Sequence, residues 1–369
     1  MNNTFSILLI GVGGAGATIA RGVNRAFGGN LRYFLADTDA TTGASGDPFL
    51  LLGGNRLSGR GSGGDMVSAR LAAAESTSAI NEFLGGVSVA VIVCSLGGGT
   101  GSGATLEIVQ RLESLSITTI VIATTPFAFE GADKNRLAQG IMPIIQDASS
   151  CAFFMPMDKL VGDVDNMQGA FRQALDSIAS AVTLFWRLVE KPGYIRLDTE
   201  KLRKLVIKAG RGRFATVTAQ GANRSAEILD SLSRSPLLTD GKGPVRTVLL
   251  GILAGEDLRL SEVGRIAEGV QSAFCARDCR FEVATVNDEE TFSGRLSVTL
   301  MMFEDGAGAG SAPAAAAPGP SRKSPRKNRD PLAQGPRDRG RFNNVEHTIW
   351  NNRDLDVPTF IRQGITIEQ

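Results

Sequence analysis

The stretch Gly97-Gly98-Gly99-Thr100-Gly101-Ser102-Gly103 decides how this chain is organised. It follows the apolar run 89–94 (VAVIVC) and precedes an amphipathic segment, 106–115. A strand, a glycine-rich turn and a helix in this order place bare backbone N–H groups around a phosphate at a helix N-terminus. Glycine suits such a turn because a Cβ would block the anion and because the backbone visits positive φ. The stretch therefore predicts a phosphate-binding loop rather than a flexible linker.

Composition narrows the class of protein. The chain has 369 residues, of which 43% are hydrophobic and 21% charged, as expected of a soluble globular protein with two domains and a large core. No apolar run approaches the ~18 residues of a membrane span, and the N-terminus lacks the basic start and cleavage site of a signal peptide. Four cysteines are too few for a disulfide framework, which favours a cytosolic protein.

Few residues are available for metal or nucleophilic chemistry. Cys275 and Cys279 have the spacing of a metal half-site on a helix, but the single histidine, His347, lies far away in a polar tail. We therefore expect no metal site built from side chains. The same scarcity of histidine argues against catalysis by a Ser-His-Asp or Cys-His arrangement.

The first part of the chain contains a second nucleotide signal. The apolar run 6–10 leads into 11–16 (GVGGAG), which opens a helical stretch reaching about Ala26. About twenty residues later, an apolar run ends in Asp37-Thr38-Asp39. A GxGxxG between a strand and a helix binds nucleotide phosphates, and an acidic residue at this distance holds a ribose in dinucleotide-binding units. Taken alone, these features fit an NAD-dependent enzyme.

Further strands and loops repeat this alternation. A third glycine-rich loop, 59–65 (GRGSGGD), precedes a helix near 66–82, and a β-branched strand, 118–124, ends in 126–131 (PFAFEG). Strands alternating with helices predict a parallel, doubly wound sheet whose ligands bind at the carboxyl ends of the strands. All the glycine-rich loops fall at those ends. The chain has no GxxxxGK[ST], so it is not a P-loop enzyme.

The order and spacing of these motifs resemble the tubulin/FtsZ GTPase family. The matching motifs are GVGGAG (11–16), ADTDA (36–40), GGGTGSG (97–103), PFAFEG (126–131), PMDKL (156–160), SPLL (235–238) and AGEDLRL (254–260). GGGTG[ST]G is the signature of that family and is highly specific. The resemblance runs from about Ile7 to Phe303, so it is not a shared local motif.

The resemblance implies an α/β fold with distinct parts. A GTP-binding domain with a doubly wound, mostly parallel sheet would span 1–170, followed by a long central helix (171–193) and a second α/β domain with a mixed sheet (194–303). A disordered basic linker (304–353) and a C-terminal partner-binding peptide (354–369) would complete the chain. The sequence agrees, because 170–190 carries an apolar helical stripe and Pro192-Gly193 ends it.

The resemblance also implies the nucleotide contacts. Glu130 would bind the ribose, Lys134 (or Arg136, if the register is shifted) the sugar and phosphates, Phe171 the guanine face, and Asp176 the guanine N1 and N2 donors. The residues implied around the phosphates are Gly13, Gly14, Ala15, Gly16, Ala17, Thr18, Gly63, Gly64, Gly97, Gly98, Gly99, Thr100, Gly101 and Ser102. The expected ligands are GTP or GDP with Mg²⁺.

In the family, hydrolysis is completed by the next subunit of a filament. A loop after the central helix, with the pattern N-x-D-x-x-D, brings two carboxylates that polarise the attacking water and help to hold the cation. Here the aligned stretch is Arg196-Leu197-Asp198-Thr199-Glu200-Lys201, so Asp198 is kept but Lys201 replaces the second carboxylate.

This departure predicts slow or altered hydrolysis. A charged lysine neither accepts a proton nor binds Mg²⁺, and losing a water-positioning group costs on the order of 10²- to 10⁴-fold. Glu200 is the expected substitute if the loop bends differently. Alternatively, Arg196 or Lys201 stabilises transition-state charge in trans, or the loop serves assembly alone.

Three further positions differ from the family's usual asparagines. Thr18, Asp37 and Leu175 each remove an amide hydrogen bond to the nucleotide, which would weaken affinity or specificity for guanine.

The tail has a different composition. Residues 306–341 hold eight basic and two acidic residues, a net of +6, so the rest of the chain carries −5 of the total +1. Such a segment cannot bury enough apolar surface to fold. The ~48 residues after Gly306 would average roughly 40 Å end to end and reach about 160 Å when extended. They would contact anionic lipid or nucleic acid, or serve as a solubilising tether.

The tail ends in 354–362 (DLDVPTFIR), which resembles the family's C-terminal peptide D-[IV]-P-x-[FY]-[LI]-R. The resemblance implies docking on membrane tethers of the FtsA or ZipA type and on division regulators. The residues implied are Asp356, Val357, Pro358, Phe360, Ile361 and Arg362.

These observations lead to one principal hypothesis. The resemblance implies a GTP-dependent protein that forms head-to-tail filaments and scaffolds the bacterial division ring, in the cytoplasm at mid-cell beneath the inner membrane. The alternatives are a structural filament with little or no GTP hydrolysis and, more remotely, a Rossmann-type NAD-dependent enzyme.

Overall fold

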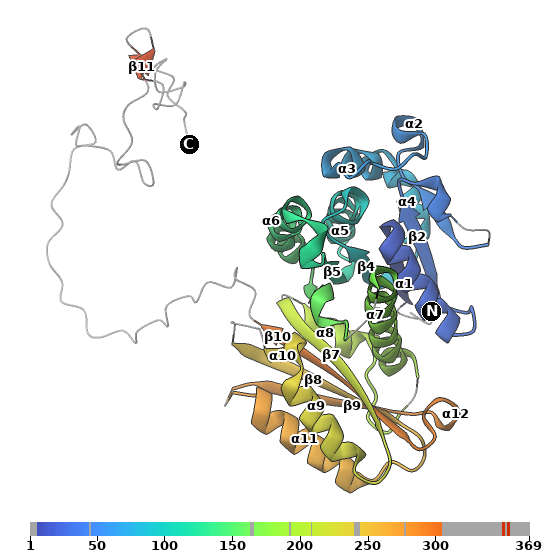
Figure 1. Ribbon diagram of the computed structural model, residues 1–369, viewed down its shortest axis with the longest axis vertical. Helices are drawn as coiled ribbons and strands as arrows, with labels where there is room; N and C mark the ends of the chain where they lie inside the picture. The colour runs from blue at the N-terminus through green and yellow to red at the C-terminus, as the bar shows by residue number, and fades with distance from the viewer. Residues whose placement is uncertain are drawn as a thin grey trace, which may run out of the picture. The chain divides into compact units, whose positions relative to one another are not determined.

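The computed structural model describes residues 6–43, 46–162, 166–191, 193–207, 209–239, 244–276, 278–304, 349–350 and 353–354. Backbone contacts divide the chain into two units, Met1–Ser311 and Ala312–Gln369. In the second unit, β11 (Ile349–Trp350) and β12 (Arg353–Asp354) form an antiparallel pair. The first unit carries the fold shown in Figure 1.

One ten-stranded sheet, in the order β3-β2-β1-β4-β5-β6-β7-β10-β8-β9, runs through the described residues of the first unit. Its strands are β1 (Ser6–Val12), β2 (Tyr33–Asp37), β3 (Phe49–Leu51), β4 (Val87–Ser95), β5 (Thr118–Thr125), β6 (Cys151–Pro156), β7 (Gly210–Gln220), β8 (Val245–Ala254), β9 (Arg280–Asn287) and β10 (Arg295–Glu304).

The direction of the strands changes along the sheet. All neighbours from β3 to β7 pair in parallel. Strand β10 is antiparallel to both β7 and β8, whereas β8 and β9 are parallel. The predicted doubly wound first half and mixed second half are therefore confirmed. The two halves join where Cys151–Phe153 of β6 pair with Gly210–Gly212 of β7.

The helices are α1 (Gly13–Ala26), α2 (Gly54–Leu57), α3 (Met66–Glu75), α4 (Thr77–Phe83), α5 (Thr105–Ser114), α6 (Ala132–Ala148), α7 (Met167–Glu190), α8 (Thr199–Val206), α9 (Arg224–Arg234), α10 (Pro236–Thr239), α11 (Leu260–Phe274) and α12 (Glu289–Phe292). The single helix predicted near 66–82 is wrong, because Ser76 separates α3 from α4. The Ser76 hydroxyl accepts from the Gly53 N–H and donates to the Ala72 carbonyl, which holds the chain at this break.

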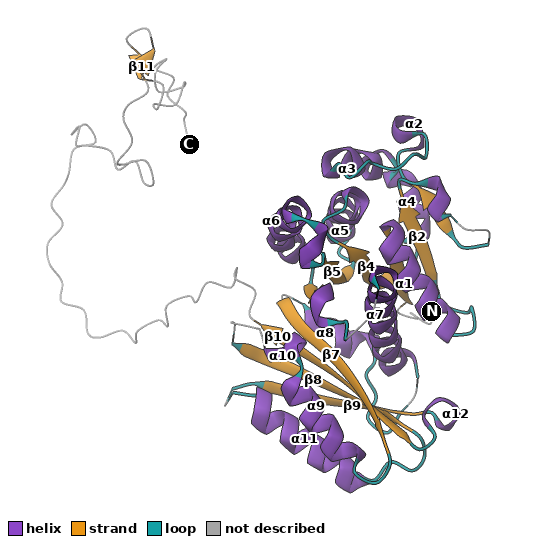
Figure 2. Cartoon of the chain, in the orientation of Figure 1, coloured by secondary structure: helices purple, strands orange, loops and turns teal. Residues whose placement is uncertain are grey.

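The helices cover the sheet in layers. Helices α1 and α7 pack on one face of the first half, α5 and α6 lie on the other, and α9 and α11 cover the second half (Figure 2). Apolar strands buried on both faces explain the long hydrophobic runs of the sequence.

Helix α7 connects the two halves. Its predicted apolar stripe is buried, including Ile178, Val182, Phe185 and Trp186. Each large apolar side chain buried in this way stabilises the fold by about 1.5–3 kcal/mol. Near its end, Leu188 packs so closely on β8 that a Cβ at Gly251 would overlap it. This contact fixes α7 against the second half.

Candidate functional site

A cleft of about 580 Å³ opens at the carboxyl ends of the parallel strands. This is the edge of the sheet predicted to bind ligands. The described residues that line it are Val12, Gly13, Gly14, Ala15, Asp37, Thr38, Asp39, Thr42, Arg60, Gly61, Ser62, Gly63, Gly64, Ser95, Leu96, Gly97, Gly98, Gly99, Thr100, Gly101, Glu130 and Lys134. Residues from five parts of the sequence therefore meet in one cleft.

The turn from β1 into α1 supplies one wall. Gly13 has a positive φ of 74°, and a Cβ at Gly14 would meet nothing within 4 Å. Gly16 does not line the cleft, and a Cβ there would overlap the Val93 carbonyl of β4. Gly16 therefore allows α1 to approach the sheet, and its predicted place among the cleft residues is not observed.

Two further residues of α1 point elsewhere. Ala17 is fully buried, and the Thr18 hydroxyl donates to the Gly14 carbonyl at 3.0 Å. Neither is among the described residues that line the cleft. They support the turn of α1.

The glycine-rich loop after β4 forms the floor. Gly97 has a φ of +91°, and a Cβ at Gly101 would overlap the Ser95 carbonyl. The Gly97 N–H donates to the buried Ser102 hydroxyl at 3.0 Å, so Ser102 closes the loop and does not line the cleft. A π-helical turn (Thr100–Ala104) then leads into α5.

A pair of hydroxyl groups joins two of these loops. Thr38 Oγ1 lies 2.7 Å from Thr100 Oγ1. Thr38 follows β2, whereas Thr100 follows β4, and the sequence motifs did not indicate that the two would meet. The hydrogen bond ties the end of β2 to the glycine-rich loop.

The loop 59–65 also lines the cleft. Gly63 and Gly64 have positive φ angles of 61° and 86°, and a Cβ added at either position would meet nothing within 4 Å. The loop packs on Gly99, where a Cβ would overlap the Ser62 hydroxyl. Asp65 ends the loop by accepting from the backbone N–H groups of Val67 and Ser68, which starts α3.

Arg60 also lines the cleft, although no motif of the sequence indicated it. Its backbone forms an isolated bridge with Asp39, and the residue lines the cleft. Within the described part of the chain, its guanidinium has neither a hydrogen bond nor an ion pair. In the sequence, the feature that could have indicated this cleft residue is an arginine within a glycine-rich loop. Arg60 adds a guanidinium to a cleft whose lining also includes the carboxylates of Asp37, Asp39 and Glu130.

Glu130 and Lys134 lie together at the start of α6. Glu130 accepts from the Phe127 N–H through Oε1 at 3.0 Å and from Lys134 Nζ through Oε2 at 3.0 Å. Both line the cleft. Arg136, the alternative to Lys134, instead pairs with Asp133 and has a 78% exposed side chain. The structure therefore brings Lys134, and not Arg136, into the cleft.

Phe171 and Asp176 lie on α7, outside the set of described residues that line the cleft. The Phe171 ring makes an edge contact with Phe127, with centroids 5.0 Å apart. Asp176 is exposed. Leu175 packs in the same small apolar cluster as Phe127 and Phe171, which accounts for an apolar residue at a position where the family has asparagine.

The carboxylate of Asp37 accepts hydrogen bonds from its own loop. Its Oδ1 accepts from the Thr38 and Asp39 N–H groups, and its Oδ2 accepts from the Thr42 hydroxyl at 2.7 Å. The residue is 4% exposed. Both oxygens of the Asp37 carboxylate therefore hold the end of β2.

The loop after α7 is attached to the edge strand β9. The Thr285 N–H donates to the Ile195 carbonyl at 2.8 Å, and the Ile195 N–H donates to the Thr285 hydroxyl at 2.9 Å. Gly193 passes so close to β9 that a Cβ would overlap the Thr285 carbonyl. This loop is therefore held by the second half of the sheet.

The residues of the predicted hydrolysis motif lie on this loop and on α8. Asp198 is exposed and caps α8 by accepting from the Lys201 N–H at 2.7 Å. Lys201 Nζ lies 2.8 Å from Glu282 Oε2 of β9, and Glu200 Oε2 lies 3.7 Å from Arg203 Nη1. None of the described residues that line the cleft comes from this loop. Within one chain, the nucleotide cleft and the hydrolysis motif are thus separate.

The described residues contain no group of three or more His, Cys, Asp or Glu side chains placed to hold an ion.

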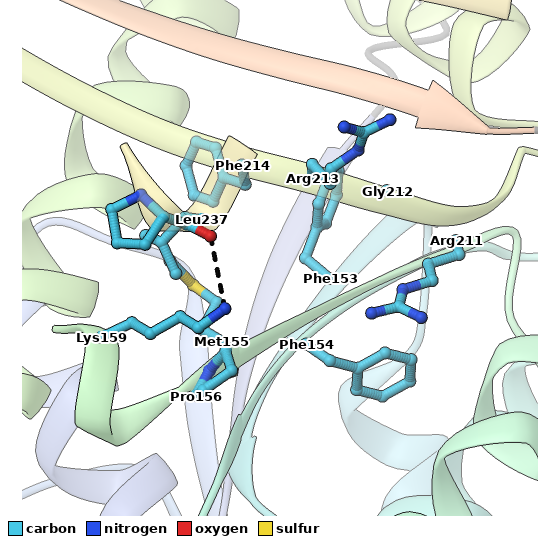
Figure 3. A pocket seen from close by; sticks show the side chains of 11 residues that line it. Phe153, Phe154, Met155, Pro156, Lys159, Arg211, Gly212, Arg213, Phe214 and Leu237 are labelled. Carbon is cyan, nitrogen blue, oxygen red and sulfur yellow. Dashed lines mark hydrogen bonds between the residues drawn. The ribbon is translucent and has the colours of Figure 1, made fainter. Parts of the chain in front are cut away.

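A second, smaller cavity of about 50 Å³ lies where β6 and β7 separate beside α10. Lys159 Nζ donates to the Pro236 carbonyl at 3.4 Å, and Phe153 packs on Phe214 (Figure 3). Two motifs of the resemblance, 156–160 and 235–238, therefore meet in space. This cavity is too small for a nucleotide and belongs to the joint between the two halves.

The C-terminal motif, Asp356 to Arg362, and the linker before Ile349 lie outside the described residues. No described helix has both the length and the apolar character needed to cross a membrane.

The site and fold define a nucleotide-binding α/β protein whose phosphate loops are glycine-rich and contain no P-loop lysine. Comparison with known proteins identifies the class. The profile "Tubulin/FtsZ family, GTPase domain" matches residues 6–165. The cell division protein FtsZ of Pseudomonas putida is 30% identical over 301 residues, covering 80% of this chain and 75% of that protein. FtsZ of Coxiella burnetii is 30% identical over 310 residues, covering 82% and 80%.

Solved structures show the same fold. An empty FtsZ dimer from M. jannaschii superposes with a TM-score of 0.74 at 24% identity, covering 81% of this chain and 88% of that one. CetZ2 from Haloferax volcanii, solved as a GTPγS-bound protofilament, gives 0.69 at 19% identity, covering 81% and 92%. The chain belongs to the Tubulin/FtsZ family, of which it is a divergent member, and it carries that family's GTPase domain.

Proposed function

We propose that this protein binds GTP in the cleft and assembles head to tail into filaments that scaffold the bacterial division ring. The observation that carries this proposal is the separation of two sites within one chain. The cleft collects the phosphate-binding loops, whereas Asp198 and its loop lie on the second half of the sheet. A complete hydrolytic site then requires the loop of a second copy.

The cleft suits a nucleotide with several phosphates. Gly14 and Gly98, where a Cβ would meet nothing within 4 Å, leave room for an anion to approach backbone N–H groups, and Arg60 and Lys134 add positive charge. Glu130 would bind the ribose. Phe171 and Asp176 would recognise the guanine where it extends beyond the described cleft toward α7. Mg²⁺, held by the phosphates, would supply charge neutralisation.

Hydrolysis is the part of the function in which this chain departs from the family. Asp198 is exposed and has one carboxylate oxygen that makes no described hydrogen bond, so it is available to the neighbouring subunit's nucleotide. Lys201 is occupied by Glu282, and Glu200 lies on the first turn of α8. Asp198 would position the attacking water, with Glu200 as the second carboxylate. We expect turnover slower than is usual for the family.

The cellular setting follows from the relatives, which are named as cell division proteins. The protein would work in the cytoplasm at mid-cell, beneath the inner membrane. Residues 356–362 would dock on a membrane tether of the FtsA or ZipA type, and the basic linker would add weak contacts with anionic lipid or nucleic acid.

A structural filament without hydrolysis is the second candidate. The Lys201–Glu282 ion pair favours it, because this pair removes a position from catalysis while strengthening the attachment of the loop. The NAD-dependent enzyme has lost its main support, because the chain belongs to the Tubulin/FtsZ family.

One experiment separates these candidates. The full-length protein is incubated with GTP, GDP or a slowly hydrolysed GTP analogue, and polymer is measured by sedimentation while phosphate release is followed in parallel. GTP-dependent polymer with phosphate release supports the first candidate, and stable polymer without release supports the second. Absence of guanine-nucleotide binding would overturn both.

A matched pair of variants ties the result to the cleft. Gly98→Val places a branched side chain in the cleft, where the glycine has no neighbour within 4 Å. Gly140→Val makes the same change at an equally open, exposed position on α6. We expect only Gly98→Val to lose nucleotide-dependent assembly. Equal loss in both variants would contradict the assignment of the cleft.

A further inference from the structure

Two thiols meet at the connection between α11 and β9. Cys275 is the residue that follows α11, and Cys279 is the residue that precedes β9. Their sulfur atoms lie 3.1 Å apart, with the Cys279 S–H directed at Cys275 Sγ. The backbone brings them together, because the Cys275 N–H donates to Gln271 and the Cys279 N–H donates to Ala276.

This arrangement differs from that of the other cysteines. Cys94 and Cys151 are fully buried in strands of the sheet, far from any reagent in solvent. Cys275 and Cys279 are both partly exposed. The proposed GTP-dependent function uses none of the four cysteines.

We propose that Cys275 and Cys279 form a dithiol site that closes reversibly to an intramolecular disulfide by exchange with low-molecular-weight disulfides. The separation of the sulfur atoms is the observation that carries this proposal. A disulfide bond is about 2.05 Å long, so the two sulfur atoms need to approach by only about 1 Å.

The exchange proceeds in two balanced steps. The thiolate of one cysteine attacks a sulfur of the small disulfide, so that a mixed disulfide forms and one small thiolate leaves. The second cysteine, after losing its proton to solvent, attacks the protein sulfur of the mixed disulfide and releases the other small thiolate. The protein dithiol is oxidised by two electrons, and the small disulfide is reduced to two thiols.

The surroundings favour closure over other reactions of a thiol pair. Among the described residues, the pair belongs to no group of three or more Cys, His, Asp or Glu side chains that could hold a metal ion. Partial burial and the adjacent Cys279 raise the pKa of Cys275 to about 12, which keeps this thiol protonated at neutral pH. The thiolate is the attacking species, so exchange becomes faster in alkaline buffer.

The site lies beside the attachment of the hydrolysis loop. Arg280 is the residue after Cys279, and its Nη2 forms an ion pair with Glu282 Oε1 at 2.9 Å. Glu282 also forms an ion pair with Lys201. A disulfide would add a covalent constraint next to this ion-pair cluster.

The test uses the full-length native protein and oxidised glutathione in mildly alkaline buffer. The reaction is stopped with acid, and products are measured by intact mass and peptide mapping. For the wild type, we expect the loss of two hydrogen atoms, a peptide linked through Cys275 and Cys279, and complete reversal by dithiothreitol. Little glutathione adduct should accumulate, because the second step is intramolecular.

Single variants provide the control. Cys275→Ser and Cys279→Ser each keep one thiol, so each should retain one glutathione on the remaining cysteine. If a variant were modified at Cys94 or Cys151, that variant would have unfolded. The wild-type result alone would then test the proposal. The proposal would be overturned if the native wild type remained unmodified, or if it accumulated stable glutathione adducts on Cys275 or Cys279 without closing the bridge.

Discussion

Lys201 Nζ lies 2.8 Å from Glu282 Oε2, which joins the start of α8 to the edge strand β9. Lys201 occupies the position at which the family pattern has its second carboxylate. A carboxylate there would face Glu282 at close range, and the like charges would repel each other. The change at position 201 is therefore accounted for by its partner on β9, which no local motif reveals.

Reversing the charge at position 201 tests this pairing. Lys201→Glu should lower the free energy of unfolding by about 1 kcal/mol, a modest amount because both side chains are partly exposed. The double variant Lys201→Glu with Glu282→Lys should recover most of the loss. Urea unfolding of the three proteins measures both effects. If the double variant is no more stable than Lys201→Glu alone, the ion pair does not hold the loop.

Asp198 combines two roles that two substitutions can separate. Asparagine also caps helices well, so Asp198→Asn should retain stability, whereas Asp198→Ala should lose about 0.5–2 kcal/mol. Both variants lack the carboxylate, so both should release phosphate more slowly under assembling conditions while still binding GTP. Unchanged turnover in Asp198→Asn would remove this residue from the mechanism.

Arg60 is expected to distinguish the triphosphate from the diphosphate. Removing a charged hydrogen-bond donor costs about 1.5–3 kcal/mol, so Arg60→Ala should weaken GTP binding by roughly 10- to 100-fold. GDP, with less negative charge, should lose less. Arg56→Ala is the control, because Arg56 lies on α2 near Glu75 and does not line the cleft. Titration with fluorescent nucleotides measures the affinities, and equal losses for GTP and GDP would contradict the prediction.

Two glycines of the phosphate loops should respond differently to alanine. A Cβ at Gly101 would overlap the Ser95 carbonyl, so Gly101→Ala should cost about 1–3 kcal/mol of stability or more. Gly14 has no neighbour within 4 Å, so Gly14→Ala should leave the thermal midpoint nearly unchanged. Thermal unfolding without nucleotide compares the two. A stable Gly101→Ala variant would show that β4 and its loop can move apart.

Stability should fall in acid through Glu262. Hydrogen bonds from the buried Arg224 hold the pKa of Glu262 below its ordinary value. A lowered pKa in the folded state stabilises the protein above the unfolded pKa of about 4.3, and this contribution disappears as the pH falls through the folded pKa. Unfolding measured from neutral to acidic pH should show this loss. Glu262→Gln should be less stable at neutral pH and should show a weaker dependence in the acidic range.

Local patterns were sufficient for much of the fold. The alternation of apolar runs, glycine-rich turns and helical stretches predicted the parallel half of the sheet, and the apolar stripe predicted α7. The same patterns could not predict the break at Ser76, because a contact with Gly53, far away in the sequence, helps to hold the chain there.

The residues that line the cleft could be predicted only in part from the sequence. Glycines that must stay bare to admit an anion and glycines that must stay bare to allow packing look identical in a sequence. Only the neighbours of Gly14 and Gly16 distinguish the two kinds. Arg60 was missed because its bridge with Asp39 depends on the folding of two loops.

The sequence by itself determined the class of protein, because its phosphate loops need particular small residues at particular spacings after strands. It also determined that position 201 lacks a carboxylate. Tertiary structure decided which loop residues face the cleft, how the hydrolysis loop is held, and which cysteines meet. Those outcomes depend on contacts between residues far apart in the chain, such as Lys201 with Glu282 and Thr38 with Thr100, which form only when the sheet brings its strands together.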